Sequence, residues 1–184
     1  MPTETARASR PRGSVFIAIS ADGFIARTNG AIDWLSAVQL EGEDYGYKEF
    51  FDSVDTLVIG RGTYDTVLGF EDWPYGDKRC VVVTHRPPAT PRRGEEFFTG
   101  APLKLVERLA REGAQRLYID GGQLIRGFLE AGLVDDLVLS VVPVLLGAGI
   151  PLFGGVAREQ RLSLSESRSW PTGLVQLRYR VGHD

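Results

Sequence analysis

Four short apolar runs constrain the fold of this chain more than any other feature of its sequence. Residues 14–20 (SVFIAIS) are apolar almost without interruption, which is typical of a strand buried on both faces. Residues 56–59, 80–84 and 116–119 have the same character, and helix-like or loop-like stretches separate them. Because strands that alternate with helices form mainly parallel sheets, the sequence predicts an α/β fold with a mostly parallel central sheet.

The remaining predicted elements fit this class. Two further strands are expected near the C-terminus, at residues 136–142 and 174–181, and the second alternates as a strand with one wetter face does. Such terminal strands often pair antiparallel beside a parallel set. Helices are expected at residues 44–52, 62–68, 103–112 and 122–131.

Two segments are predicted to be loops. Residues 143–155 are apolar, but glycines and prolines interrupt them, which excludes a regular helix or an interior strand. We expect a packed loop there and a contact within a homodimer, because a monomer would have to cover such an apolar segment. Residues 86–93 contain three prolines and are expected to form a surface loop.

Size and composition favour one domain. A chain of 184 residues with 43% hydrophobic content can bury one substantial core, and we expect a single domain at residues 14–184 after a disordered tail at residues 1–13. The net charge of −3 and the lack of a long basic block argue against a nucleic-acid partner. No segment approaches the roughly 20 apolar residues of a membrane span, and no signal peptide is evident, so we expect a cytoplasmic protein without a membrane partner.

The soft metal ligands are few. Cys80 is the only cysteine, and His85 and His183 are the only histidines. An internal disulfide is therefore impossible, and we expect no bound metal.

A glycine turn follows the second predicted strand. Gly60, Arg61, Gly62 and Thr63 lead from that strand into a helix, where free backbone N–H groups and the positive end of the helix dipole can bind phosphate. The alternative is an ordinary strand-to-helix turn. The turn matches neither a P-loop nor the six-residue Rossmann fingerprint.

A second glycine turn comprises residues 120–123, directly after the strand that ends at residue 119. Because Gly121 and Gly122 lack Cβ atoms, a pyrophosphate can approach their backbone closely. In open α/β sheets ligands bind beyond the carboxyl ends of the strands. Two such turns on neighbouring strand ends therefore predict a dinucleotide site.

The third strand ends in Thr84, His85 and Arg86, which offer a hydroxyl, an imidazole and a guanidinium. Together with Arg61, these groups can hold a sugar phosphate by charge-assisted hydrogen bonds, which favours NADPH over NADH. The alternative is that Arg86 is a solvated loop residue.

Taken together, four motifs resemble the dihydrofolate reductase superfamily. Within it, they are most similar to the RibD C-terminal domain, which is the reductase domain of the bifunctional riboflavin-biosynthesis protein. The motifs are residues 20–26 (SADGFIA), 58–64 (VIGRGTY), 118–122 (YIDGG) and 144–153 (VLLGAGIPLF). The resemblance covers residues 14–181 and implies a three-layer dihydrofolate reductase-like fold with an antiparallel C-terminal strand.

The resemblance also implies residues that bind NADPH. The first strand and the loop after it would cover the nicotinamide with Ala18, Ile19 and Ile25. The side that binds the adenosine 2′-phosphate would be formed by Gly60, Arg61, Thr63, Thr84, His85 and Arg86. The side that binds the pyrophosphate would be formed by Gly121, Gly122, Gln123 and Leu124.

Two acids are candidates for catalysis by the same resemblance. Asp44 is the closest match to the acid that dihydrofolate reductases carry in the helix before the second strand, with Glu43 and Glu41 as the alternatives in register. In an apolar cleft the raised pKa of Asp44 would let it relay a proton to a C=N bond. Asp22 matches a loop that borders the substrate ribose. The alternatives are a solvated residue in the first helical turn for Asp44 and a turn former for Asp22. Trp34 and Phe50 could wall a pocket for a flat heterocycle, or could simply be core aromatics.

The chain departs from the bifunctional riboflavin protein in lacking the paired cysteines and His-x-Glu of a zinc deaminase, which implies a stand-alone reductase. Beyond Lys48 and Arg27, no basic residues are clearly placed to bind a phosphate or a carboxylate tail. The resemblance implies an NADPH-dependent reductase of a pyrimidine precursor of riboflavin, 5-amino-6-(5-phosphoribosylamino)uracil, by hydride transfer to a ribose imine. Reduction of dihydrofolate or another pterin is the alternative, as is a nucleotide-binding module without turnover.

Overall fold

The computed structural model describes residues 10–157 and 159–182. Its centre is an eight-stranded sheet in the order β5-β4-β3-β6-β1-β7-β10-β9. The strands are β1 (Arg12–Ser20), β3 (Thr56–Gly60), β4 (Arg79–Val83), β5 (Glu96–Phe98), β6 (Arg116–Asp120), β7 (Asp136–Val142), β9 (Leu162–Ser169) and β10 (Val175–Val181). The six strands from β5 to β7 pair in parallel, whereas β10 pairs antiparallel with both β7 and β9. The α/β class, the mostly parallel sheet and the antiparallel C-terminal strand are therefore confirmed.

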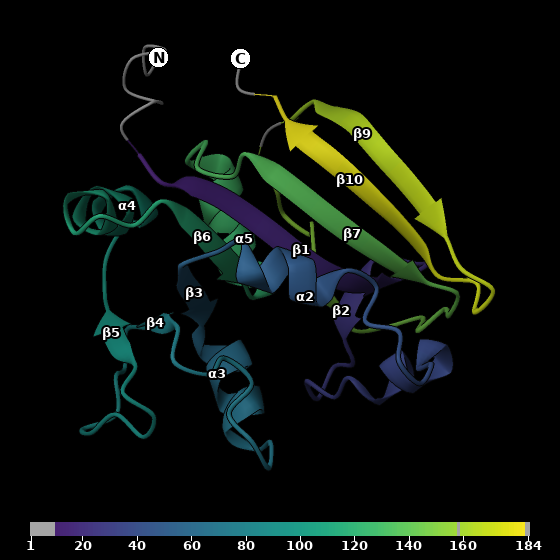
Figure 1. Ribbon diagram of the computed structural model, residues 1–184, viewed down its shortest axis with the longest axis horizontal. Helices are drawn as coiled ribbons and strands as arrows, with labels where there is room; N and C mark the ends of the chain where they lie inside the picture. Colours follow the sequence, from purple (N-terminus) through teal and green to yellow (C-terminus); the bar gives the residue numbers. More distant parts are fainter. Residues whose placement is uncertain (1–9, 158, 183–184) are drawn as a thin grey trace.

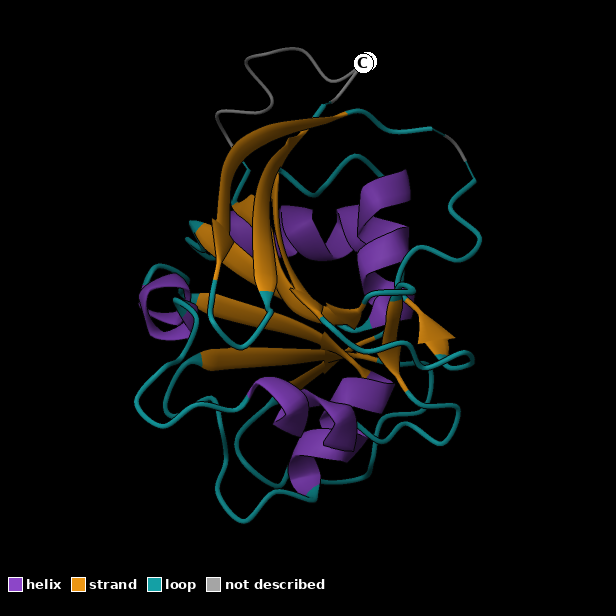
Figure 2. Ribbon diagram, turned by 90° about the vertical axis from the view of Figure 1, so that its right-hand side faces the viewer, coloured by secondary structure: helices purple, strands orange, loops and turns teal. Residues whose placement is uncertain are grey.

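Helices cover both faces of this sheet (Figures 1 and 2). The helices α2 (Tyr47–Asp52) and α3 (Arg61–Leu68) lie on one face, and α4 (Pro102–Arg111) and α5 (Gly122–Glu130) lie on the other. Each buries its apolar stripe: α4 places Leu105 and Leu109 in the core, and α5 places Ile125 and Phe128 there. The result is the three-layer arrangement that the resemblance implies.

Smaller elements lie around the carboxyl ends of the strands. A 3-10 helix, η1 (Asp33–Val38), packs with the end of β7. The short strands β2 (Phe24–Ala26) and β8 (Ile150–Pro151) pair as a separate two-stranded sheet. Apart from β8, residues 143–155 form turns and loops, as their glycines and prolines predict, and residues 86–93 form an exposed loop.

Two predicted boundaries need correction, and one strand was not predicted. Strand β1 begins at Arg12, so the predicted disordered tail is too long, and residues 1–9 lie outside the described residues. Helix α2 begins at Tyr47 and not at residue 44, because the backbone turns at Gly46, whose φ is +80°. Strand β9 was not predicted, because its side chains are almost all exposed and its sequence has little apolar content.

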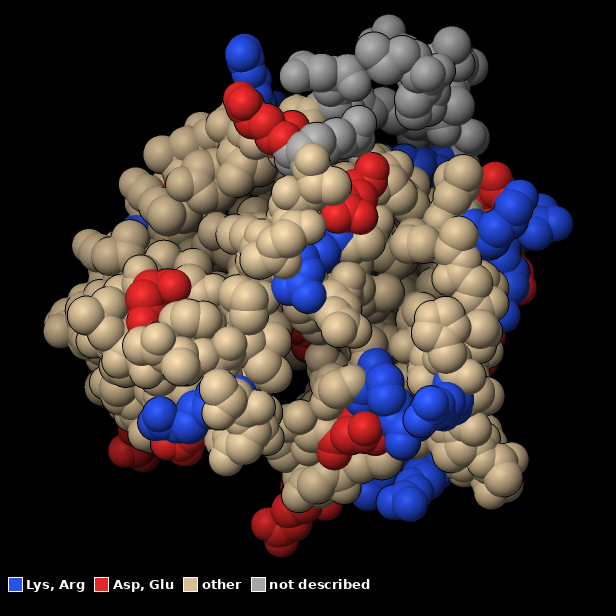
Figure 3. All heavy atoms as spheres, turned by 180° about the vertical axis from the view of Figure 1, so that it is seen from behind, with Lys and Arg blue, Asp and Glu red and all other residues tan. Residues whose placement is uncertain are grey.

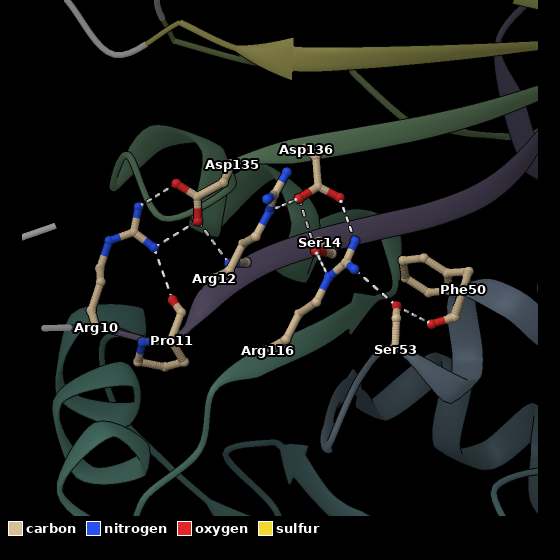
Figure 4. Close-up of polar contacts among 10 residues, drawn as sticks. Arg10, Pro11, Arg12, Ser14, Phe50, Ser53, Arg116, Asp135 and Asp136 are labelled. Atoms are coloured by element: carbon tan, nitrogen blue, oxygen red, sulfur yellow. Dashed lines mark hydrogen bonds and ion pairs between the residues drawn. The ribbon is translucent and has the colours of Figure 1, made fainter. Parts of the chain in front are cut away.

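Ion pairs tie the amino ends of the central strands together (Figure 4). The buried carboxylate of Asp136, at the start of β7, accepts hydrogen bonds from Arg12 on β1, from Arg116 on β6 at 3.1 Å and from the hydroxyl of Ser14 at 3.0 Å. Arg116 also donates to the hydroxyl of Ser53, just after α2. These contacts fix the amino ends of three neighbouring strands, at the end of the sheet opposite the two glycine turns. None of the helices within the described residues is long and apolar enough to cross a membrane.

Candidate functional site

The two glycine turns lie in contact at the carboxyl ends of β3 and β6. These strands are direct neighbours, with Ile59 paired to Asp120. A Cβ atom built on Gly121 would lie 3.1 Å from the Thr63 hydroxyl oxygen and 3.4 Å from the Gly60 nitrogen. The expectation that the two turns flank each other is therefore confirmed.

Both turns open helices whose first N–H groups are not capped by a side chain. Helix α3 follows Gly60 and helix α5 follows Gly121, and neither N-terminus has a side-chain capping hydrogen bond. Gly121 has a φ of +111°, which L side chains rarely adopt. Two uncapped helix ends beside a backbone free of Cβ atoms form a cradle suited to an anionic, pyrophosphate-like group.

The neighbouring strand β4 brings basic residues to one side of this cradle. Arg61 donates a hydrogen bond from Nη1 to the carbonyl oxygen of Arg86 at 2.8 Å, and it also pairs with Asp65. The buried hydroxyl of Thr84 accepts the N–H of Arg86 at 3.1 Å, while His85 and Arg86 are exposed. In Figure 3, Lys and Arg side chains gather on the lower part of the back face. This side can bind a second phosphate.

The other side of the cradle lies between β1 and β6. Pairing of these strands ends at Ser14 and Tyr118, although β1 continues to pair with β7 as far as Ser20. Beyond Ser14, the edge of β1 that includes Ala18 thus has no strand partner on its β6 side among the described residues. Ile25 lies against Gly122 at this side of the cradle, since a Cβ atom built on Gly122 would lie 2.8 Å from the Ile25 Cδ1 atom. The Tyr118 hydroxyl bridges the two strands beyond Ser14 by donating to the Phe16 carbonyl oxygen at 3.1 Å.

Three predicted cofactor residues differ in what they can offer. Gln123 is exposed in the first turn of α5. Leu124 is buried in the core beside Gly60, so only its backbone can reach the cradle. Ile19 packs against the same core cluster and is half-buried.

Sequence reasoning missed the acid that lies at the centre of the site. Asp120 ends β6 and accepts the N–H of Gly121 at 2.9 Å. Burial raises its pKa from 3.8 to about 6, and the hydrogen bond from Gly121 lowers it only in part. The signal was present in the motif at residues 118–122, where an acid at the end of an apolar strand directly precedes two glycines.

Three tyrosines lie near enough to this carboxyl group for its charge to affect their pKa values. Burial, followed by the charge of Asp120, raises the pKa of Tyr47 to about 12 and raises the pKa values of Tyr75 and Tyr118. The Tyr118 hydroxyl donates to the carbonyl oxygen of Phe16 at 3.1 Å. All three hydroxyls therefore stay protonated near neutral pH and make the surroundings of Asp120 polar without adding a cation.

The prediction for Asp44 is wrong. Its side chain is exposed before α2, where it accepts the backbone N–H groups of Gly46 and Lys48 at 2.9 Å each. These hydrogen bonds lower its pKa instead of raising it. A solvated carboxylate held in its charged form does not fit the role of a proton donor.

Asp22 does not fit that role either. Its exposed carboxylate accepts the hydroxyl of Ser20 at 2.6 Å and the backbone N–H groups of Leu146 and Gly147. The hydrogen bond from Ser20 is the largest cause that lowers its pKa. Asp22 is thus bound to two segments of the chain as a carboxylate.

The two predicted aromatic residues have different surroundings. Phe50 is buried in α2, where its ring packs against Phe16 and Tyr118 at centroid distances of 5.0 and 4.9 Å, so its prediction as a pocket wall is corrected to a core residue. Trp34 is also buried, on η1, but its indole N–H has no hydrogen-bond partner. A buried donor without a partner is costly, which makes Trp34 a candidate contact for a ligand acceptor.

Comparison with known proteins adds a family to this geometry. The protein-family model of the RibD C-terminal domain matches residues 11–176 of this chain. The Riboflavin biosynthesis protein RibD of Corynebacterium ammoniagenes is 31% identical over 157 residues, which are 77% of this chain and 45% of that protein. The region of similarity thus includes both glycine turns and Asp120.

Two relatives match over nearly their whole length. The Uncharacterized protein YwjB of Bacillus subtilis (strain 168) is 36% identical over 167 residues, which are 90% of this chain and 95% of YwjB. The crystal structure of a Putative riboflavin biosynthesis protein from Shewanella sp. PV-4 is 35% identical, with a TM-score of 0.87 over 94% of this chain and 99% of that one.

Proposed function

The chain belongs to the RibD C-terminal domain family, and from that premise we propose that it is a cytoplasmic, NADPH-dependent reductase of a small heterocyclic substrate that carries a C=N bond. The observation that carries the proposal is the junction of the two glycine turns with Asp120, the one carboxyl at this junction whose pKa lies near neutrality. A dinucleotide cradle and a proton donor are the two parts that such a reductase needs.

The cradle fits the cofactor on one specific ground: a Cβ on Gly121 or Gly122 would fill the space beside Thr63 and Ile25. Gly121, Gly122 and the N-terminus of α5 would hold the pyrophosphate, and Arg61 and Arg86 the 2′-phosphate. Ala18 and Ile25 would enclose the nicotinamide. When bound there, NADPH supplies the hydride.

Asp120 would supply the proton. With a pKa of about 6 it is partly protonated in the neutral range, and its neutral form can donate a hydrogen bond to a substrate nitrogen. As the proton leaves, the carboxylate is stabilised by the Gly121 N–H.

Trp34 supports a substrate with a hydrogen-bond acceptor. Its indole N–H has no hydrogen-bond partner. Trp34 belongs to a hydrophobic cluster against which Ala18 packs, and Ala18 is the residue assigned to the nicotinamide side. A carbonyl oxygen or ring nitrogen of a pyrimidine or pterin would satisfy this donor. The two cations that the sequence offered for an anionic tail form exposed ion pairs, Arg27 with Asp33 and Lys48 with Asp52.

The test is a titration of the purified protein with NADPH and with NADH, followed by fluorescence. 5-Amino-6-(5-phosphoribosylamino)uracil and dihydrofolate are then added separately while NADPH absorbance is recorded. Tight NADPH binding and oxidation by one substrate would support the proposal. Binding without oxidation by either would favour another substrate or a module without turnover, and binding of neither dinucleotide would exclude the reductase.

The proposal includes a homodimer. Large apolar side chains are exposed around the loop that follows β7, namely Leu145 (76% exposed), Ile150 and Phe153. Further along the chain Leu162 and Leu164 are exposed on β9. A second copy of the chain would cover these residues. The molar mass from light scattering distinguishes a dimer from a monomer.

A further inference from the structure

Asp22 joins two segments that are far apart in the sequence. Its Oδ1 atom accepts the Ser20 hydroxyl at 2.6 Å and the Leu146 N–H at 3.1 Å, and its Oδ2 atom accepts the Gly147 N–H at 2.7 Å. Ser20 in turn accepts the N–H of Phe24 at 2.9 Å. One exposed carboxylate therefore fastens the loop after β1 to the loop after β7.

The joined loops continue as a small unit over the start of α5. Ala26 and Phe24 on β2 pair with β8, and the Leu152 N–H donates to the Gly23 carbonyl at 3.1 Å. Arg126 on α5 donates to the carbonyl oxygen of Pro151 at 2.8 Å. Arg126 thus ties this unit to α5, whereas Asp22 joins its two loops, together with the Ala21 N–H, which donates to the Val144 carbonyl oxygen at 2.8 Å.

Each side of the Asp22 contact touches a different part of the site. On one side, Ile25 lies against Gly122, on the cofactor cradle. On the other side, Leu146, whose N–H binds Asp22, packs against the hydrophobic cluster that contains Trp34. Loss of the Asp22 hydrogen bonds would therefore let the loop that carries Ile25 move relative to the loop that carries Leu146.

We propose that Asp22 is a positioning residue: it fastens the loop of residues 143–149 to the loop of residues 20–26, and in this way it holds Ile25 over the cofactor cradle and Leu146 beside Trp34. This role rests on the proposed NADPH-dependent function. It replaces the catalytic role that the sequence suggests for Asp22, because the carboxylate oxygens are used by protein donors.

The variant Asp22→Asn tests this role with little change of shape. A carboxylate accepts hydrogen bonds at both oxygens, whereas an amide accepts at one and donates at the other. In Asp22→Asn the amide NH₂ group must face either the Gly147 N–H or the pair of donors at Oδ1. Ser20→Ala removes one of those donors and the acceptor for Phe24, and so tests the same contact from the other side. Asp77→Asn is the matched control, because Asp77 is an exposed aspartate of another loop.

The measurement combines hydrogen exchange by NMR with NADPH titration of the full-length chain. We expect Asp22→Asn to speed exchange of the Leu146 and Gly147 amides by about tenfold, while the core amides of Val58 and Ile119 keep their rates. We expect the NADPH dissociation constant to rise by about threefold to tenfold in Asp22→Asn and to change in the same direction in Ser20→Ala. Asp77→Asn should change neither quantity.

Two outcomes would overturn the role of Asp22. Unchanged exchange and NADPH affinity in Asp22→Asn would do so, even with reduced turnover, because that pattern belongs to a proton donor. Faster exchange throughout the core would point to general destabilisation instead. If the wild-type chain bound no NADPH, the proposed function would fail, and the exchange rates of Leu146 and Gly147 would still decide whether Asp22 holds the loops together.

Discussion

Thr63 lies against Gly121, so that a Cβ atom on the glycine would come within 3.1 Å of the threonine hydroxyl oxygen. These two residues belong to turns that are separated by more than fifty positions in the sequence, and each turn opens a helix without a side-chain cap. Their contact makes one anion cradle from two separate strand ends.

Gly122→Ala should weaken NADPH binding by about tenfold or more, because the new Cβ would lie 2.8 Å from the Ile25 Cδ1 atom and would occupy the backbone face proposed for the pyrophosphate. Gly127→Ala, in the same helix, is the control: its Cβ would meet only Pro102 at an ordinary 3.8 Å. Equal affinities of both variants in a fluorescence titration would remove Gly122 from the site.

Asp120→Asn should lower turnover by about a hundredfold or more, since an amide cannot transfer a proton. With a raised pKa of about 6, the wild-type acid is protonated below that pH, so its rate should fall as the pH rises above 6. The variant should have a flat profile in this range. Initial rates of NADPH oxidation from pH 5 to 9 check both expectations, and an identical pH dependence in the two proteins would exclude Asp120 as the proton donor.

Asp120 should also make stability depend on pH. Because its pKa rises from 3.8 to about 6 on folding, the folded chain binds more protons between these values, and this contribution to stability is lost as the pH rises from about 4 through 6. The loss is at most about 3 kcal/mol. Urea unfolding should therefore show Asp120→Asn gaining stability relative to the wild type between pH 4 and pH 8. A constant difference across this range would contradict the raised pKa.

Arg86→Ala should reduce the preference for NADPH over NADH by about tenfold, because a charge-assisted contact to the 2′-phosphate would be lost while NADH has no such group. The two dissociation constants, measured at one ionic strength, give the ratio. Arg111→Ala, at the far end of α4, serves as the control for net charge. The same loss of affinity for both dinucleotides would show that Arg86 does not distinguish them.

Asp136→Ala should destabilise the fold by about 3 kcal/mol, because it leaves Arg116 and the buried hydroxyl of Ser14 without their common acceptor. Asp52→Ala removes an exposed partner of Lys48 and should cost no more than about 0.5 kcal/mol. Free energies of unfolding from urea titrations separate the two cases. A cost below about 1 kcal/mol for Asp136→Ala would mean that the network in Figure 4 contributes little.

The sequence by itself determined the features whose causes are local. Buried parallel strands need continuous apolar runs, so residues 14–20 and 116–119 could be recognised directly. A glycine that follows such a strand and opens a helix creates free N–H groups through its own backbone, so both glycine turns were also predictable. Strand β9 has no such local signal, because its side chains are almost all exposed.

The tertiary structure alone decided which acid lies at the site. A carboxyl group's pKa depends on burial and on hydrogen-bond donors that come from other segments, and Asp44, Asp22 and Asp120 look alike in a sequence. Folding leaves Asp44 in solvent, binds Asp22 to the Leu146–Gly147 backbone, and removes Asp120 from water far enough to raise its pKa. The strand runs and glycine turns follow from neighbours in the chain, whereas the chemistry of each carboxyl follows from neighbours in space.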